Sequence, residues 1–311
     1  MSTPDARCAF IVGEALIDVV HKADGTVAEH PGGSPTNVAL TLGRLGRQAQ
    51  LLAWFGQDAH GTLITEWLKE SHVTVAEGSD KAKKTSVAIA TLAQDGSATY
   101  EFDLDPQIPA DATVPAGSIV AHTGSIAPIL EPGGPDILAL LTSARDTATI
   151  TYDPNARPSL MGDVAVARPL IEEYVKISDV VKVSDEDLEW LYPGEGPQTI
   201  AQNWLALGPA VVVVTLGGSG AIGVSAAGVI NVAAQKVTVV DTVGAGDSFM
   251  GALIHGLWQA DLLGADQRAN LLAITSQQLT TVLEQCTKVA AITVSRAGAN
   301  PPWQAELNTN S

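Results

Sequence analysis

Short apolar runs alternate with helix-periodic segments through the second half of the chain, and this alternation limits the possible fold more than any other feature. The apolar runs, which are typical of buried strands, lie at 118–122, 148–152, 180–183 and 210–215. Segments with apolar residues at helical spacing lie at 136–143, 164–174, 185–191 and 200–207. Strands that alternate with helices form a mainly parallel sheet with helices on both faces. The sequence therefore predicts an α/β fold.

Two β-rich stretches of the first half do not fit this alternation. Residues 85–92 and 98–104 are strand-like, and the Asp-Gly pair at 95–96 between them is typical of a hairpin turn. The stretch 15–31 is also strand-like and contains a turn at 23–25. We predict that 15–31 and 85–107 form a small β-sheet lying over the main body as a lid. Because no linker or internal repeat divides the chain, residues 1–311 are expected to make one domain.

The remaining pattern predicts further elements at both ends of the chain. Strands are expected at 8–12, 49–55 and 236–240, with a second hairpin at 221–224 and 229–232. Helices are expected at 37–45, 61–70, 248–258 and 268–289. The polar tail after Pro302 is expected to fray.

A small-residue turn at 241–247 separates the strand-like run 236–240 from the helix that comes next. Backbone N–H groups of Gly244, Ala245 and Gly246 are expected to be uncovered where that helix begins, and such a helix start binds anions. Asp247 lies beside this site, where a second negative charge would be out of place. One interpretation is a base that acts on a nucleophile attacking a phosphate; the other is an aspartate favoured there only by the helix dipole.

The net charge of the chain limits the classes of molecule that it can be expected to bind. The sequence has 34 acidic and 17 basic residues, a formal net charge of −17, which argues against a nucleic-acid partner. A nucleotide is not excluded, because its phosphates are held by local N–H groups. No signal peptide and no apolar run long enough to cross a membrane is visible, so no membrane partner is expected. The two cysteines, Cys8 and Cys286, are expected to be buried thiols, and a cytoplasmic location is the expectation.

Two motifs together resemble the ribokinase-like (PfkB) carbohydrate kinases. They are Gly-Gly-Ser-Pro-Thr-Asn at 32–37 and Asp-Thr-Val-Gly-Ala-Gly-Asp at 241–247, about 200 residues apart, and the resemblance extends over nearly the whole chain. It implies a three-layer α/β/α ribokinase-like fold with a β-sheet lid. It also implies an enzyme that transfers the γ-phosphate of ATP to a primary sugar hydroxyl. Asp247 would be the general base, and the N–H groups of Gly244, Ala245 and Gly246 would form the anion hole.

The resemblance also assigns residues to the sugar. Asp18, Gly33, Ser34 and Asn37 would bind it, with the carboxylate and amide suited to paired hydroxyls and Gly33 allowing a close backbone approach. Arg157 would lie near the sugar or the phosphate. Taken singly, Asp18 would be interpreted as a turn or capping residue, Asn37 as a first-turn helix residue, and Arg157 as a surface arginine.

On the nucleotide side, the resemblance assigns Lys182, Thr215, Gly217 and Gly246 to ATP. Asp187 stands where the family carries a glutamate that orients Mg²⁺ through water, and a shorter carboxylate can still hold a hydrated ion. The other interpretation of Asp187 is an acidic residue in the first turn of a helix that Ser184 caps. The letters of 218–223 also spell GxGxxG, the dinucleotide pattern of an oxidoreductase, but the segment after them looks β-like and not helical. We therefore reject that class.

A monovalent cation site beside the anion hole is a further implication of the resemblance. Asp241, the carbonyl of Val243 and that of Gly298 would build it, which makes K⁺ an optional activator. Pro302 stands where relatives often carry a small hydroxyl residue.

Within the family, the segments 13–18, 122–126 and 153–158 are similar to those of bacterial fructokinases. The segment after Phe102 is shorter than in many of them and lacks their Trp. The alternatives in the same family are a 2-keto-3-deoxygluconate kinase, which would need basic residues for its acid substrate, and a ribokinase. A catalytically silent sugar or nucleotide sensor is the alternative from another class. The resemblance allows a homodimer through the lid, because exposed strand edges can pair.

Overall fold

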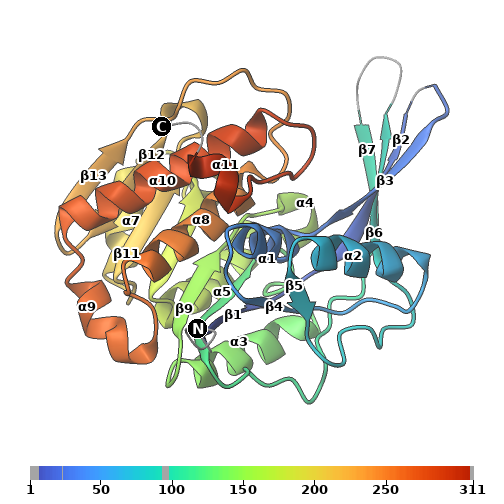
Figure 1. The fold of residues 1–311 in the computed structure, drawn as a ribbon, viewed down its shortest axis with the longest axis horizontal. Coiled ribbons are helices and arrows are strands. Elements are labelled where there is room, and N and C mark those ends of the chain that lie inside the picture. The colour runs from blue at the N-terminus through green and yellow to red at the C-terminus, as the bar shows by residue number, and fades with distance from the viewer. Residues whose placement is uncertain (1–6, 23, 93–97, 309–311) are drawn as a thin grey trace.

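A large sheet with helices on both faces and a small sheet projecting from one end make up the molecule (Figure 1). The computed structural model describes residues 7–22, 24–92 and 98–308. The turn expected at 23–25 therefore lies partly outside the described residues, and the one expected at 95–96 lies wholly outside them. Two layers of helices enclose the large sheet, which is the three-layer α/β/α arrangement expected from the sequence.

Within the described residues, the large sheet has nine strands in the order β13-β12-β11-β10-β9-β8-β1-β4-β5. Pairing is parallel from β5 to β11 and antiparallel from β11 to β13. The strands are β1 (Cys8–Val12), β4 (Ala49–Leu52), β5 (Val73–Val75), β8 (Ser118–Gly124), β9 (Thr149–Asp153), β10 (Val180–Ser184), β11 (Val211–Thr215), β12 (Ala221–Ser225) and β13 (Gly228–Val232). The parallel part follows from the strand–helix alternation of the sequence, and the hairpin at its edge was also predicted.

Helices from both ends of the chain pack on the same face of this sheet. Helices α1 and α10 contact its strands and both pack against α8, while α3, α5 and α7 contact strands from the other face. The helices are α1 (Ser34–Arg44), α2 (Ala59–Glu70), α3 (Gly133–Ala144), α4 (Pro158–Met161), α5 (Val164–Ile177), α6 (Asp185–Leu191), α7 (Pro197–Leu205), α8 (Ala245–Gln259), α9 (Arg268–Leu272), α10 (Ser276–Val294) and α11 (Gln304–Asn308). The pairing of α1 with α8 matters most, because it joins the N-terminal and C-terminal motifs.

The small sheet has the order β3-β2-β6-β7 among the described residues. It consists of β2 (Leu16–His21), β3 (Val27–Gly32), β6 (Ser86–Leu92) and β7 (Ala98–Asp103). The outer pairs β2–β3 and β6–β7 are antiparallel, while the central pair β2–β6 is parallel. It extends away from the body at the upper right of Figure 1. Its strands come from the two β-rich stretches of the first half that did not fit the strand–helix alternation.

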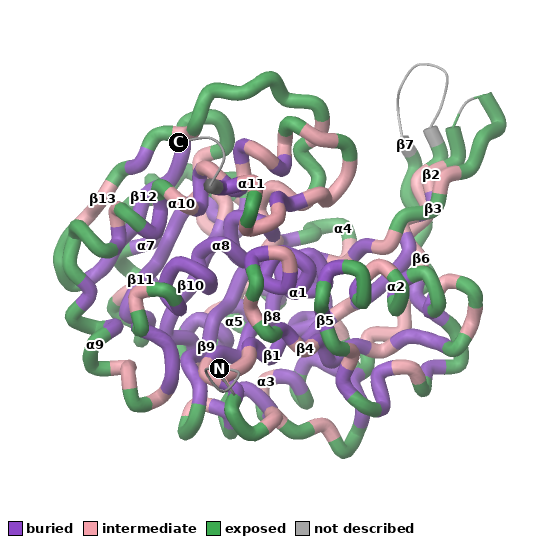
Figure 2. The backbone as a smooth tube through the Cα atoms, viewed as in Figure 1, coloured by how far each residue is buried: buried purple, intermediate pink, exposed green. Residues whose placement is uncertain are grey.

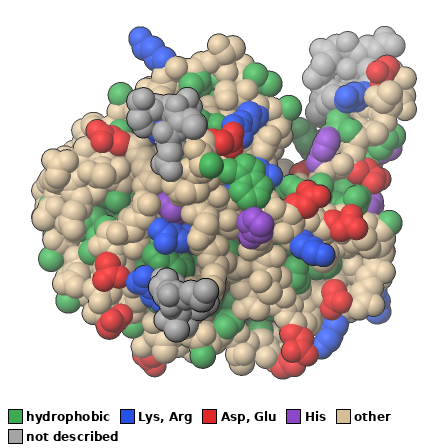
Figure 3. Space-filling view, viewed as in Figure 1, with side chains coloured by type: hydrophobic (Ala, Val, Ile, Leu, Met, Phe, Trp, Pro, Cys, Tyr) green, Lys and Arg blue, Asp and Glu red, His purple; other side chains and the backbone are tan. Residues whose placement is uncertain are grey.

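Two apolar clusters form the core, one on each face of the large sheet. One contains α1, α8 and α10 side chains, and the other contains α3, α5 and α7 side chains. Figure 2 shows the resulting buried band through the body and the more exposed backbone of the projecting sheet. On the face seen in Figure 3, basic side chains of the described residues are dispersed among acidic ones, unlike the continuous basic surface of a nucleic-acid binder. None of the described helices is both long and apolar enough to cross a membrane.

Several predicted elements are wrong in detail. Residues 236–240 form no strand; Val237, Val239 and Val240 are exposed, and no neighbouring strand pairs with this segment among the described residues. The helix expected at 268–289 is two helices, α9 and α10, because Thr275 begins the second one with a capping box. Residues 304–308 are helical instead of frayed, and Cys8 is half-buried instead of buried.

The α1–α8 contact is close enough for one methyl group to disturb it. A Cβ at Gly251 would lie 2.6 Å from the Cβ of Thr41 in α1. We expect Gly251→Ala to lower the free energy of unfolding by about 1–3 kcal/mol through overpacking, against the usual preference of helices for alanine. Urea unfolding measures this. Gly218→Ala, where no atom lies within 4 Å of the new methyl, is the control; equal midpoints for the two variants would contradict the prediction.

Candidate active site

The C-terminal edge of the parallel strands gathers the polar segments singled out in the sequence. Because β11, β10, β9, β8 and β1 are parallel neighbours, the residues that come after them lie along one edge of the sheet. In open α/β sheets this edge is where ligands bind. The N-termini of α1 and α8 reach the same place, since the two helices pack together. The motifs at 32–37 and 241–247 meet there.

The carboxylate of Asp247 is the point at which the two motifs touch. Asp247 is 6% exposed. Its Oδ1 accepts hydrogen bonds from Ser34 Oγ at 2.7 Å and from Asn155 Nδ2 at 3.1 Å. Its Oδ2 accepts one from Asn37 Nδ2 at 2.7 Å. Three donors from two other segments therefore hold this side chain in one orientation.

Ser34 and Asn37 reach Asp247 because α1 begins just after a glycine. Gly33 has φ +106°, and a Cβ there would lie 2.3 Å from the carbonyl oxygen of Glu14. Only glycine fits this conformation and this approach. Pro35 in the first turn has a fixed φ suited to a helix start. The close backbone approach at Gly33 is thus made to Glu14.

The turn before α8 presents free N–H groups beside Asp247. Gly244 has φ +73°, and a Cβ there would lie 2.6 Å from the Cβ of Ala299, so glycine is required. The N–H of Ala245 donates to the carbonyl of Thr242 at 3.2 Å, so one of the three groups expected to be uncovered has a partner. Within the described chain, no hydrogen bond is made by the N–H groups of Gly244 and Gly246. These two remain available to an anion.

A buried lysine lies beneath this turn. Lys182 Nζ makes an ion pair with Asp153 Oδ2 at 2.9 Å, and both side chains are at most 3% exposed. A Cβ at Gly246 would lie 2.9 Å from Lys182 Nζ, so the ammonium sits against the start of α8. Burial is the largest single influence and alone would lower the pKa of Lys182. The charge and hydrogen bond of Asp153, together with the charges of Asp187 and Asp247, outweigh burial and raise that pKa. Lys182 thus carries a fixed positive charge next to the free N–H groups.

Burial raises the pKa of Asp153 to about 6, against the opposing charge of Lys182. Its second oxygen, Oδ1, has no hydrogen-bond partner among the described residues. A buried carboxylate oxygen of this kind can accept from a ligand or an ordered water. Asp153 was not among the predicted site residues, although its segment, 153–158, is one of those that resemble bacterial fructokinases.

Glu14 is a second residue that the sequence analysis did not assign. It comes after β1, and its carboxylate accepts from the N–H of Ser34 at 3.2 Å and of Ala127 at 3.3 Å. Burial raises its pKa to about 7, although these hydrogen bonds and one from Ser125 oppose the shift. Glu14 thus joins the start of α1 to the loop after β8. A carboxylate between an apolar strand and the glycine-rich motif was the only signal for it.

Asn155 is the third unassigned residue, and it contacts Asp247 directly. It comes after β9 with φ +35°, a left-handed conformation that asparagine tolerates better than most residues. Besides Asp247, its Nδ2 donates to Ser34 Oγ at 2.8 Å. Arg157, which is exposed, directs Nη1 to the side-chain oxygen of Asn155 at 2.8 Å. Arg157 therefore contacts the site through Asn155.

Asp18 lies on β2 of the small sheet, away from the hydrogen-bonded group around Asp247. Burial raises its pKa above the ordinary value, and the charges of His30 and Arg157 oppose this shift. Its Oδ2 would lie 2.3 Å from a Cβ at Gly32, so the side chain is directed toward the backbone just before α1. The Asp18 carboxylate therefore lies beside the end of β3, where the charge of Arg157 acts on it.

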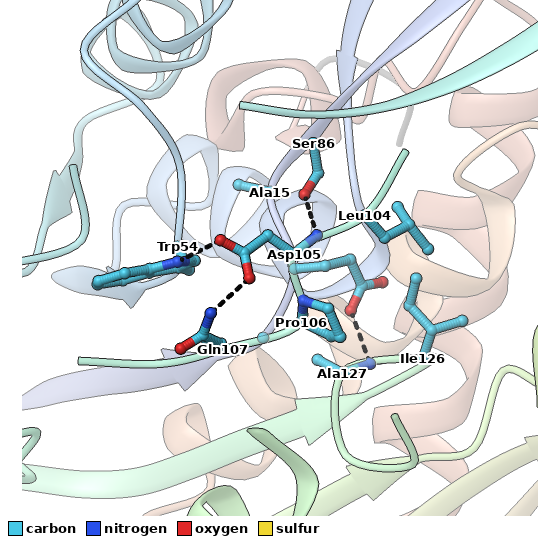
Figure 4. A pocket seen from close by; sticks show the side chains of 11 residues that line it. Ala15, Trp54, Ser86, Leu104, Asp105, Pro106, Gln107, Ile126 and Ala127 are labelled. Atoms are coloured by element: carbon cyan, nitrogen blue, oxygen red, sulfur yellow. Dashed lines mark hydrogen bonds between the residues drawn. The ribbon is translucent and has the colours of Figure 1, made fainter. Parts of the chain in front are cut away.

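A pocket lies where the small sheet meets the body (Figure 4). Asp105, which comes after β7, accepts from Trp54 Nε1 at 2.9 Å and from Gln107 Nε2 at 2.6 Å. Its N–H donates to Ser86 Oγ at 3.0 Å. The lining consists of Gly13, Glu14, Ala15, Trp54, Ser86, Leu104, Asp105, Pro106, Gln107, Ile126 and Ala127. Glu14 belongs both to this pocket and to the support of α1.

Asp187 lies in the first turn of α6, the helix that Ser184 caps, as the alternative interpretation of this residue predicted. Ser184 caps α6, and the Asp187 side chain completes the capping box by accepting from the N–H of Ser184 at 3.2 Å. Its other oxygen accepts from the N–H of Ala156 at 2.9 Å. Each oxygen keeps a lone pair for a water molecule. The structure thus confirms the capping interpretation and leaves the metal role a prediction.

The remaining predicted residues lie at two other places along this edge. Thr215 ends β11, and Gly217 begins the short 3₁₀ turn after it. The strand β12 comes directly after this turn, which agrees with the rejection of the GxGxxG pattern as a dinucleotide motif. Asp241 accepts from the N–H of Val243 at 3.0 Å and of Gly298 at 2.8 Å, and these bonds lower its pKa. Asp241 therefore ties the turn before α8 to the loop at 296–302.

Asp247 lies beside the N–H groups of Gly244 and Gly246, which are available to an anion at the start of α8. This arrangement, at the ligand-binding edge of a three-layer α/β/α fold with a small projecting sheet, is that of a phosphotransferase of the ribokinase-like class. The model of the pfkB family of carbohydrate kinases matches residues 8–306. The chain belongs to this family. It is a phosphotransferase that acts on a sugar hydroxyl.

Individual proteins that are similar to this chain are also sugar kinases. A fructokinase of Rhizobium leguminosarum bv. trifolii is 34% identical over 277 residues, which cover 83% of this chain and 82% of the relative. A solved sugar kinase of Pyrococcus horikoshii in complex with ATP is 25% identical, with a TM-score of 0.78 over 97% of this chain and 98% of that one. A fructokinase of Vibrio cholerae, solved with fructose, ADP and calcium, has a TM-score of 0.79 at 23% identity over 98% and 99%. The last supports the fold alone.

Proposed function

We propose that this protein is an ATP-dependent fructokinase with Asp247 as its general base. The observation that carries the proposal is the placement of this carboxylate. Hydrogen bonds from Ser34, Asn37 and Asn155 orient it, and it lies directly after the free N–H groups of the turn before α8. A base next to an anion site suits the attack of a hydroxyl on a phosphate.

The reaction transfers one phosphoryl group and one proton. Asp247 takes the proton of a primary sugar hydroxyl as that oxygen forms a bond to the γ-phosphorus of ATP. The bond from the γ-phosphorus to the bridging β–γ oxygen breaks, and ADP leaves. The N–H groups of Gly244 and Gly246, with the ammonium of Lys182 beneath them, stabilise the charge of the transferring group. Thr215 and Gly217 lie along the same edge and are proposed to contact the nucleotide.

Metal ions are proposed to support the phosphates. Mg²⁺ bound with ATP would neutralise part of their charge, and Asp187 would hold it through water. The donor set fits, because Asp187 keeps lone pairs free and Asp153 Oδ1 is an unpartnered buried acceptor close by. Asp241 bridges the two loops from which Val243 and Gly298 would offer carbonyls, so K⁺ is proposed as an activator there.

The sugar is proposed to lie between α1 and the small sheet. Ser34 and Asn37 approach it from α1, and Gly33 from the position just before that helix. Asp18 approaches from β2 and Arg157 from the loop after β9. Exposed Val27, Tyr100 and Phe102 on the small sheet support the proposal that two copies pair through this lid.

A neutral sugar fits this end of the molecule better than a sugar acid. Among the residues proposed to contact the sugar, Asp18 and Asp247 are acidic and only Arg157 is basic. A bound carboxylate would be repelled there unless Arg157 reached it. The fructokinase relatives favour fructose over ribose.

A screen of ATP consumption tests the proposal. We expect turnover with fructose, and a kcat/KM for 2-keto-3-deoxygluconate lower by about 100-fold or more, since burying an unpaired charge costs several kcal/mol. Ribose, tagatose and nucleosides complete the panel, each with and without K⁺. Turnover with 2-keto-3-deoxygluconate alone would overturn the choice of sugar. Nucleotide binding without turnover on any member would instead support a silent sensor.

A further inference from the structure

We propose that Asn155 and Ser34 act as a clamp on one oxygen of Asp247 and thereby assign the proton to the other oxygen. Both are positioning residues in this proposal, which rests on the proposed role of Asp247 as the base. The clamp holds Oδ1. The second oxygen, Oδ2, is the one that accepts the proton of the sugar hydroxyl.

Three hydrogen bonds close a triangle around Oδ1. Ser34 Oγ donates to Oδ1 at 2.7 Å, Asn155 Nδ2 donates to Oδ1 at 3.1 Å, and Asn155 Nδ2 donates to Ser34 Oγ at 2.8 Å. The donor count is consistent, because a hydroxyl has one hydrogen and two lone pairs while an amide nitrogen has two hydrogens. Ser34 gives its only proton to Asp247, and Asn155 gives one proton to each of the others. Oδ1 is thus occupied by two donors that also fix each other.

Arg157 determines the orientation of the Asn155 amide. A guanidinium has only donors, so the amide atom that faces Arg157 Nη1 at 2.8 Å must be the oxygen. The nitrogen must then face Ser34 and Asp247. Arg157 Nη1 also donates to the backbone carbonyls of Asn155 at 2.9 Å and Ala156 at 2.9 Å, which holds this left-handed turn in place. The contact therefore does not depend on an arbitrary choice of amide orientation.

The other oxygen of Asp247 has a different kind of partner. Oδ2 accepts only from Asn37 Nδ2 among the described residues, and the amide oxygen of Asn37 is buried without any partner. An amide with one satisfied and one unsatisfied end is suited to reorient when a sugar hydroxyl arrives. Oδ2 can then exchange the Asn37 donor for the hydroxyl, while Oδ1 stays bound.

This asymmetry predicts an effect on the chemical step and not on sugar binding. A carboxylate held at one oxygen keeps the other within reach of the hydroxyl, and small errors in such placement are costly in rate. Asn155 is not among the residues proposed to contact the sugar. Loss of its amide should therefore lower kcat and leave the sugar KM close to its original value.

A double-mutant cycle tests the clamp. Asn155→Gly removes the amide but tolerates the left-handed backbone, and Ser34→Ala removes the hydroxyl. We expect each to lower kcat by about 10- to 100-fold, the usual loss for one hydrogen bond to a charged group. The sugar KM should change by less than about threefold in Asn155→Gly, whereas Ser34→Ala should also raise it, because Ser34 is proposed to contact the sugar. The double variant should lose less than the product of the two effects, because each donor fixes the other and either change already loosens the hold on Oδ1. Ser248→Ala, the neighbouring residue of α8 whose hydroxyl bonds to the Ala245 carbonyl, is the matched control with unchanged kcat.

Several outcomes would overturn the clamp. They are an unchanged kcat in both single variants, a raised sugar KM with unchanged kcat in Asn155→Gly, or independent losses that multiply in the double variant. A readout that needs no turnover separates this proposal from the proposed function. The carboxyl ¹³C signal of Asp247, assigned by its loss in Asp247→Asn, should move in Asn155→Gly and stay in Ser248→Ala. A wild-type protein inactive on every sugar would overturn the function, and the ¹³C signal would then decide the clamp alone.

Discussion

Asp247→Asn is expected to lower kcat by about 10²–10⁴-fold, because the variant lacks a group that can take the proton of the sugar hydroxyl. The substitution should leave the fold intact. The new amide nitrogen would face Asn37 Nδ2, a second donor, but the Asn37 amide can turn and present its unpartnered oxygen. Nucleotide affinity is expected to stay close to that of the wild type, since the free N–H groups of Gly244 and Gly246 are unchanged. Turnover with fructose and calorimetric titration with the nucleotide measure the two quantities.

The control lies at the other end of the same helix. Asp261 comes after α8, is exposed, and pairs only at the surface with Arg7. Asp261→Asn should leave both turnover and nucleotide binding unchanged. Turnover within about tenfold of wild type in Asp247→Asn would be too small a loss for a general base and would contradict the assigned role.

Local sequence patterns were sufficient to predict most of the fold. Periodicity and turn residues act over a few positions, so the strands around 118–124, the hairpin at 221–232 and the helix after Gly244 could be predicted without knowledge of their partners. The segment 236–240 shows the limit of such patterns. Its alternating valines are typical of a strand, but a strand needs a partner, and no described strand lies beside it. Sheet pairing is a tertiary property that the pattern does not contain.

The residues of the site also divide into those that local motifs predict and those that depend on the tertiary structure. Asp247, Ser34 and Asn37 could be predicted because each belongs to a compact motif, and the structure brings the two motifs into direct contact. Asn155 and Glu14 were missed, since their importance depends on the order of the strands. Asn155 comes after β9 and reaches Asp247 only because β9 lies beside β10 and β8 in the sheet. The available signal was the similarity of 153–158 to bacterial fructokinases, and it identified the segment but not the residue.

Lys182→Met is expected to lower the free energy of unfolding by about 3–5 kcal/mol, the usual cost of removing one partner from a buried ion pair. The substitution leaves the Asp153 carboxylate at the centre of the sheet without its cation, close to Asp187 and Asp247. Lys176→Met is the matched control. Lys176 pairs with Glu173 on an exposed face at 2.7 Å, and surface pairs of this kind contribute little to stability because solvent screens them. Urea unfolding of both variants measures the difference.

The free energy of unfolding that Lys182→Met loses should also depend on pH, and the loss should be larger at higher pH. Burial raises the folded pKa of Asp153 to about 6 from an ordinary value of 3.8 even with Lys182 present, and removing Lys182 raises it further. The folded state then binds more protons than the unfolded state at any pH between these values, so stability falls as pH rises through that range. The variant should therefore be closer to wild type at about pH 5 than at about pH 8. Asp153→Asn, added to Lys182→Met, removes the buried charge and should restore part of the stability at pH 8. An equal loss at both pH values, or no recovery in the double variant, would show that packing and not charge accounts for the effect.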